Sequence, residues 1–74
     1  MLDVYKDGRV FYNEEELKQQ YTTKGMVVTI DAREYYVHKL VAERYLKDYK
    51  PFYKVVHING NVTDNKVENL KIEI

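Results

Sequence analysis

The sequence predicts a small α+β domain in which antiparallel β-hairpins pack with one amphipathic helix. Asp7-Gly8 and Asp31-Ala32-Arg33 each lie between short stretches of β-branched and aromatic residues, a pattern typical of hairpins. From Val37 onward the apolar residues recur every three or four positions instead, as on one face of an α-helix. Seventy-four residues provide a single hydrophobic core, so residues 1–74 are treated as one domain.

Two hairpins are expected. In the first, residues 4–6 and 9–12 are joined by Asp7-Gly8, because glycine readily adopts the positive φ of a tight turn. In the second, residues 26–30 are rich in β-branched side chains and pair with residues 34–37. Both pairings predict antiparallel strands with short connections.

A short helix is expected over residues 14–20. Asn13 followed by Glu16 three positions later resembles a capping box, and acidic residues suit the positive end of a helix dipole. Together with the first hairpin, this helix would make residues 1–25 an N-terminal unit that ends at Lys24-Gly25.

The main helix is expected to run for about ten residues from Val37. Val37, Leu40, Val41 and Tyr45 would form its apolar face, and Pro51 would end it, because proline donates no backbone hydrogen bond and restricts the preceding residue.

The last third of the chain is expected to return to extended structure. Residues 52–58 read as a strand, Asn59-Gly60-Asn61 as a turn, residues 65–69 as a short helix and residues 70–74 as a terminal strand.

Composition limits the possible functions. The chain has no cysteine, which removes disulfides, thiolate metal sites and cysteine nucleophiles and favours a cytoplasmic location. No apolar run approaches the roughly 20 residues of a membrane span, so we expect no membrane partner. Twelve Lys and Arg balance twelve Asp and Glu, so nucleic-acid binding would depend on a local patch.

Residues 33–54 are the basic part of the chain, with six Lys and Arg against three Asp and Glu. A solvated helix face is the ordinary explanation of such a stretch. If it binds nucleic acid, the candidates for phosphate contact are Lys39, Arg44, Lys47, Lys50 and Lys54.

The residues that can carry chemistry lie between His57 and Asn69. His57 stands in an extended stretch, Asn69 follows twelve residues later, and Asn65 lies between them. Folding the strand, the loop and the short helix together would bring His57 and Asn69 to the same side. A neutral imidazole that takes a proton from water, beside an ion held by oxygen ligands, can hydrolyse a phosphodiester.

In these residues the chain resembles the HNH endonucleases, particularly the short phage and intron-associated type. The matching segments are Val37-His38-Lys39-Leu40-Val41-Ala42, Val56-His57-Ile58-Asn59-Gly60-Asn61 and Glu68-Asn69-Leu70, in that order. The resemblance covers roughly residues 26–74, which would form the HNH-like core. It implies a C-terminal ββα-metal motif, in which two antiparallel strands and a helix surround one divalent cation, Mg or Mn.

The resemblance also implies a role for each matching residue. His57 would be the general base that activates water, and Asn69 would be a metal ligand. Asn65 would hold the loop by hydrogen bonds, with Asn59 and Gly60 as part of the same structural motif. His38 would open the helix and serve in packing or a backbone hydrogen bond.

Two positions depart from the family pattern. Val56 stands where the family usually has the second protein ligand, and valine cannot coordinate a cation. Asn59 stands where the family usually has Asp, which removes another negative charge, and Asp64 is the nearest replacement carboxylate. An ion would then be held by Asn69, water and substrate alone.

Three functions therefore stay open. We predict a nuclease-derived module with weak or lost metal-dependent cleavage that acts mainly by binding nucleic acid or a host protein. The alternatives are an active Mg- or Mn-dependent nicking endonuclease and a small protein-binding inhibitor or regulator; without cleavage, no cofactor is needed. DNA would bind through residues 33–54, and a stand-alone enzyme would dimerise, borrow a partner's DNA contacts or act with little sequence preference. A phage-encoded protein would act in the host cytoplasm.

Overall fold

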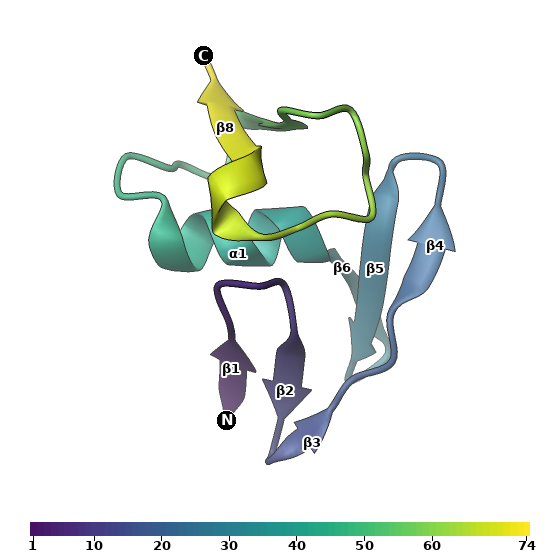
Figure 1. The fold of residues 1–74 in the computed structure, drawn as a ribbon. Helices are drawn as coiled ribbons and strands as arrows, with labels where there is room; N and C mark the ends of the chain where they lie inside the picture. The colour runs from purple at the N-terminus through teal and green to yellow at the C-terminus, as the bar shows by residue number, and fades with distance from the viewer.

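The computed structural model describes all of residues 1–74. Three small antiparallel sheets surround one α-helix (Figure 1). The elements in chain order are β1 (Leu2–Val4), β2 (Val10–Tyr12), β3 (Glu15–Glu16), β4 (Gln20–Thr22), β5 (Gly25–Ile30), β6 (Arg33–Tyr36), α1 (Val37–Tyr45), β7 (Lys54–His57), the 3-10 helix η1 (Val67–Asn69) and β8 (Leu70–Glu73). None of the helices has the length and apolar character needed to span a membrane. The architecture is the predicted α+β class.

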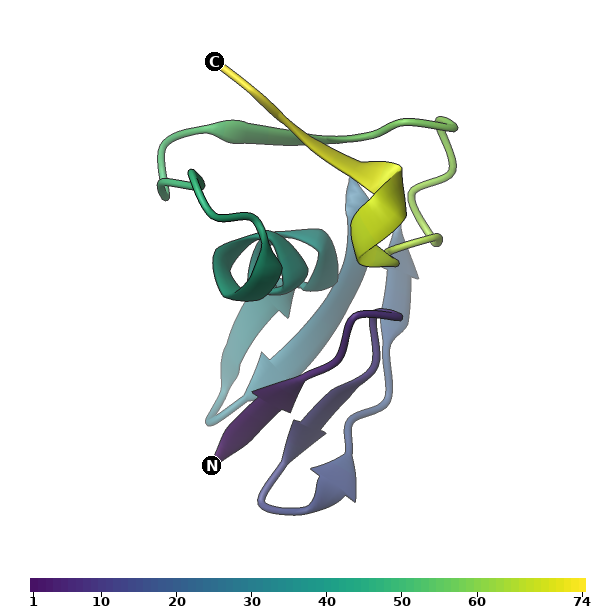
Figure 2. The ribbon, with the colours of Figure 1, turned by 60° about the vertical axis from the view of Figure 1, so that its left-hand side comes forward.

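The hydrophobic core is built from small side chains of all three sheets and α1. Its buried members are Val4, Val10, Val28, Val37, Val41, Ala42, Val55 and Leu70. None of the eight tyrosines is buried. Figures 1 and 2 show α1 enclosed by the β1–β2 hairpin, the β5–β6 hairpin and the β7–β8 pair, so the core lies around the helix.

The first hairpin forms as predicted, with Val4 opposite Val10, but the predicted helix over residues 14–20 is wrong. Asn13 and Glu14, with φ of 52° and 70°, form a two-residue turn into β3, and Tyr12 pairs with Glu15. Leu17 is the only apolar residue between positions 14 and 20, so a helix there would have no apolar face to bury. Glu15 and Glu16 pair with β2 instead, and Leu17 N–H donates to Val10 O.

The second hairpin is confirmed. β5 pairs with β6 from Val27 opposite Tyr36 to Ile30 opposite Arg33, and Asp31 and Ala32 form the positive-φ turn. The structure adds a strand that was not predicted, because β4 pairs with the other edge of β5.

The main helix begins as predicted but ends at Tyr45, well before Pro51. Leu46 is already extended, and the chain then makes turns in which Tyr49 N–H donates to Leu46 O and Tyr53 N–H donates to Lys50 O. Tyr45 and Leu46 pack against the core, and the Tyr45 hydroxyl donates to the carbonyl of Val4. We attribute the end of the helix to this packing, not to proline.

The C-terminal segment forms as expected, with β7 paired to β8 from Lys54 opposite Glu73 to His57 opposite Leu70. The short helix before β8 is a single 3-10 turn, η1. The long connection from β7 to η1 carries most of the candidate site.

Candidate active site

His57 and Asn65 are joined by a short side-chain hydrogen bond. His57 ends β7, and its Nε2 lies 2.6 Å from Oδ1 of Asn65. Because an amide oxygen only accepts, Nε2 carries the proton and donates it to Asn65. The lone pair of the neutral ring is then on Nδ1. Asn65 is buried and its Nδ2 has no hydrogen-bond partner, so the hydrogen bond to His57 is the one polar contact of this side chain, and it orients the ring of His57.

His38 lies beside His57 at the start of α1. The ring centroids of His38 and His57 are 5.0 Å apart with an interplanar angle of 67°, and the ring centroid of Tyr36 is 5.2 Å from that of His38. Burial, and then the neighbouring His57 and Lys39, lower the pKa of His38 to about 4. His38 is therefore a neutral, packed side chain at neutral pH, and its buried Nδ1 has no hydrogen-bond partner.

Gly25 makes room for this histidine. A Cβ at position 25 would lie 2.9 Å from Cε1 and Nδ1 of His38, closer than real Cβ atoms approach other atoms. The close contact between β5 and the ring of His38 thus depends on the missing side chain.

Asn69 braces the loop between β7 and η1. Its Oδ1 accepts the backbone N–H of Asn59 at 3.1 Å, and its Nδ2 donates to Asn59 Oδ1 and Asp64 O, both at 2.9 Å. The Asn69 side chain is buried, and the carbonyl of Asn69 accepts the N–H of Ile58 as well. In this structure Asn69 has the loop-holding role that the sequence assigned to Asn65.

The turn after His57 is closed on itself by side chains. Oδ1 of Asn59 also accepts the N–H of Asn61 at 2.8 Å, and Nδ2 of Asn59 donates to Asp64 Oδ2 at 3.1 Å. Asp64 Oδ2 is in addition 3.4 Å from the ammonium of Lys66. Gly60 supplies the positive φ of 75° that this turn needs. Asn59 and Asp64 are thus engaged within the loop.

The N-terminal hairpin supports this loop, a role that the sequence pattern did not reveal. A Cβ at Gly8 would lie 3.1 Å from Cβ of Asn65, and Val67 N–H donates to Lys6 O at 2.8 Å. Gln19 Nε2 donates to Gly8 O and holds the hairpin turn from the other side. Residues 1–25 therefore position Asn65, the partner of His57.

The side chains do not form a divalent-metal site of their own. No group of three or more His, Cys, Asp or Glu side chains converges in the structure. Oδ1 of Asn59, Oδ1 of Asn69 and Oδ2 of Asp64 accept hydrogen bonds within the loop, Asp64 Oδ2 is also paired with Lys66, and Val56 has no donor atom. Across the β7–β8 pair, Val56 faces Lys71, a cation that disfavours a second positive charge nearby. The residues present therefore do not fit the ion that the resemblance implies.

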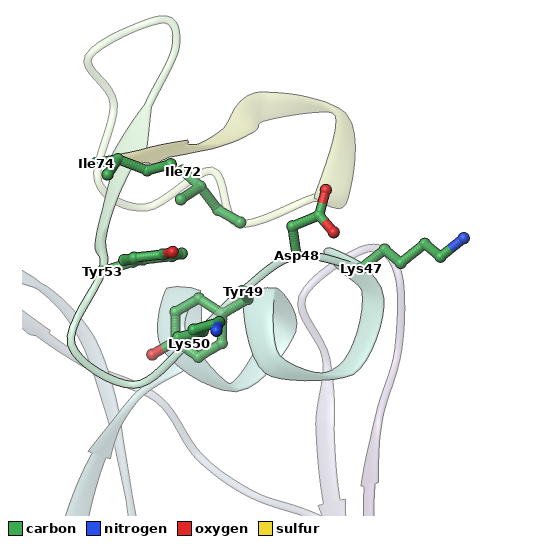
Figure 3. Close-up of a pocket in the computed structure, with 7 residues that line it drawn as sticks. All are labelled: Lys47, Asp48, Tyr49, Lys50, Tyr53, Ile72 and Ile74. Carbon is green, nitrogen blue, oxygen red and sulfur yellow. The ribbon is translucent and has the colours of Figure 1, made fainter.

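The five predicted phosphate-contacting residues do not form one patch. Lys39 and Lys54 line one hollow and Lys47 and Lys50 another, whereas Arg44 lies exposed in the last turn of α1. The second hollow has a volume of about 580 Å³ and is lined by Lys47, Asp48, Tyr49, Lys50, Tyr53, Ile72 and Ile74. Figure 3 shows Lys47 extending away from the other side chains of this hollow.

Lys24 joins Lys39 and Lys54 at the first hollow, although it lies far from them in the sequence. It was not predicted because residues 21–32 carry no net charge. The sheet order places the β4–β5 turn beside α1, and no local sequence signal indicates that contact.

No protein-family model matches the chain, and no curated protein matches its sequence. The chain is similar to a solved structure of the HNH homing endonuclease I-HmuI, described as showing DNA binding and cleavage by that enzyme. The match has a TM-score of 0.80 and a sequence identity of 25%, and it covers 97% of this chain. It spans 45% of the other chain. The shared fold thus includes the N-terminal hairpin that supports Asn65.

Proposed function

Because the chain belongs to the HNH endonuclease family by its fold, we propose that it is an HNH-type DNA-binding module whose metal-dependent cleavage is weak or lost. One observation carries this proposal. His57 is oriented as a base by Asn65, but the oxygen ligands that should accompany it are absent or engaged in the loop. The fold and the base are kept, and the ion site is not.

The base itself is arranged for proton transfer. With Nε2 bound to Asn65, the free Nδ1 of His57 can accept a proton from water, and the imidazolium that forms keeps its hydrogen bond to the Asn65 oxygen. His38 adds no competing charge, because its lowered pKa keeps it neutral beside His57 at neutral pH. We assign no further step, because the residues do not fit the divalent ion.

DNA binding is supported by the unpaired basic side chains. The chain forms two ion pairs, Arg9 with Asp7 and Lys66 with Asp64, and neither includes a lysine or arginine of residues 33–54. Those six cations are free to contact phosphates, which supply most of the affinity of non-specific DNA binding. The matched structure is that of a protein that binds and cleaves DNA.

Active metal-dependent nicking is the second candidate. The observation that favours it is again the His57–Asn65 pair, because a neutral His57 whose Nδ1 is left without a protein partner has the free lone pair that a general base requires. An active enzyme would need Mg²⁺ or Mn²⁺ bound by water and DNA phosphate oxygens.

Nicking of supercoiled plasmid in Mg²⁺ or Mn²⁺ separates the two candidates. The native chain is compared with three variants: His57→Ala, the double variant Val56→Asp/Lys71→Ala, and the double variant with His57→Ala added. The proposal expects the native chain to bind the plasmid but to nick it slowly or not at all, and the double variant to nick it faster in a reaction that requires His57. Metal-dependent nicking by the native chain that is as fast as that of the double variant and disappears in His57→Ala would establish the second candidate instead.

A further inference from the structure

Three lysines from three separate elements meet at one hollow. Lys24 lies in the turn between β4 and β5, Lys39 lies on α1, and Lys54 begins β7. The hollow has a volume of about 380 Å³, and none of the residues that line it is Asp or Glu. Convergence from distant parts of the chain makes this hollow a feature of the tertiary structure and not of one basic segment.

The three ammonium groups have no counter-ion. All three side chains are exposed, and neither ion pair of the chain includes one of them. Lys39 Nζ lies 5.9 Å from the ring centroid of Tyr36, which also lines the hollow, so a cation–π contact helps to hold that charge over the wall. Unpaired cations around a concave surface attract a phosphate group.

An exposed aromatic ring stands at the same hollow. Phe52 is 79% exposed, and Tyr53 supports it edge-on, with ring centroids 4.9 Å apart and an interplanar angle of 77°. Exposed aromatic rings beside a basic groove stack the bases of single-stranded nucleic acid. The bases within a duplex are already stacked on both faces and cannot stack on the ring of Phe52.

The hollow adjoins the candidate active site. His38 lines the hollow, and its ring centroid is 5.0 Å from that of His57. The hollow and the candidate active site therefore share the ring of His38 as a common wall.

We propose that this hollow binds an unpaired nucleotide of single-stranded DNA, with its phosphate on Lys24, Lys39 and Lys54 and its base on Phe52. The inference rests on the proposed DNA-binding function and specifies the form of DNA that the module prefers. The Lys47–Lys50 hollow does not compete for this role, because Asp48 lies in its lining and Ile72 and Ile74 form much of its wall.

Fluorescence anisotropy with a labelled oligothymidine and a duplex of equal length, over a range of salt concentrations, tests the proposal. Lys24→Ala and Lys54→Ala should each weaken single-strand binding and reduce the slope of log affinity against log salt by about 0.7. Phe52→Ala should weaken single-strand binding on the order of tenfold and leave duplex binding unchanged. Lys18→Ala is the matched control, because Lys18 is exposed, unpaired and outside the hollow.

The outcomes distinguish this inference from the proposed function. If native chain binds DNA and the hollow variants bind like Lys18→Ala, the hollow is not the site, and the DNA-binding function stands. If Phe52→Ala weakened single-strand and duplex binding equally, the proposal that an unpaired base stacks on Phe52 would also be refuted. If native chain binds neither DNA, both the inference and the proposed function are wrong. All the substituted side chains are exposed, so circular dichroism should show a native fold in each variant.

Discussion

Nε2 of His57 and Oδ1 of Asn65 are 2.6 Å apart, although eight positions separate the two residues in the sequence. Asn65 lies in turn against Gly8 of the first hairpin turn, so the orientation of His57 depends on both ends of the chain. This relationship links the fold to the proposed chemistry, because a base that is free to rotate cannot present one chosen nitrogen to water.

Asn65→Leu should release the tautomer of His57. Nitrogen-15 NMR of the neutral ring should show the Nε2–H form in native chain and a mixture of both forms in Asn65→Leu. Asn65→Asp should restore the native tautomer, because a carboxylate oxygen also accepts from Nε2. A native spectrum in Asn65→Leu would mean that Asn65 does not position the ring.

The stability of the fold should depend on pH through His38. The pKa of His38 is about 4 in the folded chain, against the ordinary 6.5 of a solvated histidine in the unfolded chain, so between these pH values the unfolded state binds more protons. The free energy of unfolding should therefore fall as pH drops from about 6.5 to about 4, by about 2 to 3 kcal/mol. Denaturant unfolding across this range measures it.

The variant His38→Gln isolates this contribution. It removes the titrating ring and leaves the carboxylates unchanged. The difference between the free energies of unfolding of the native chain and of His38→Gln, measured at each pH, should therefore show the contribution of His38 alone. An NMR titration in which His38 takes up a proton near pH 6.5 would contradict the expected dependence.

Asn69→Ala should destabilise the fold without any metal present. Three hydrogen bonds to Asn59 and Asp64 would be lost, two of them leaving backbone groups without a partner. The expected loss is about 2 to 4 kcal/mol in the free energy of unfolding, measured by urea denaturation in EDTA. If Asn69 served only as a metal ligand, Asn69→Ala would be less stable than the native chain only in the presence of Mg²⁺ or Mn²⁺. That result would restore a metal role for Asn69.

Gly25→Ala and Gly60→Ala form a matched pair. Gly60 has a positive φ of 75° with open space around it, so alanine there should cost only the backbone strain, about 1 kcal/mol. Gly25 combines a φ of 146° with a Cβ that would meet the His38 ring, and we expect about 2 to 3 kcal/mol. Thermal or denaturant unfolding of both variants gives the comparison. Equal losses would show that the His38 ring moves freely aside.

The hairpins, the start of α1 and the strand, turn and short helix of the C-terminal segment were predictable because each has a local cause. Turn residues that tolerate positive φ lie between β-branched segments, and apolar residues repeat at the helical period. The acidic run after Asn13 led to the wrong prediction of a helix over residues 14–20, because that prediction also rested on a local pattern alone. A capping pattern is local, but a helix without an apolar face has nothing to bury.

Residue types and spacing determined that this chain is a small α+β domain, and its resemblance to the HNH endonucleases pointed to His57 and to Val56, a residue that cannot be a metal ligand. Only the tertiary structure decided which asparagine makes which contacts, since Asn65 is hydrogen-bonded to His57 and Asn69 braces the loop. It also brought Lys24 to Lys39 and Lys54. The physical reason is that hydrogen-bond partners and charge clusters depend on distances in space, and residues far apart in sequence acquire these distances only when the sheets pack around α1.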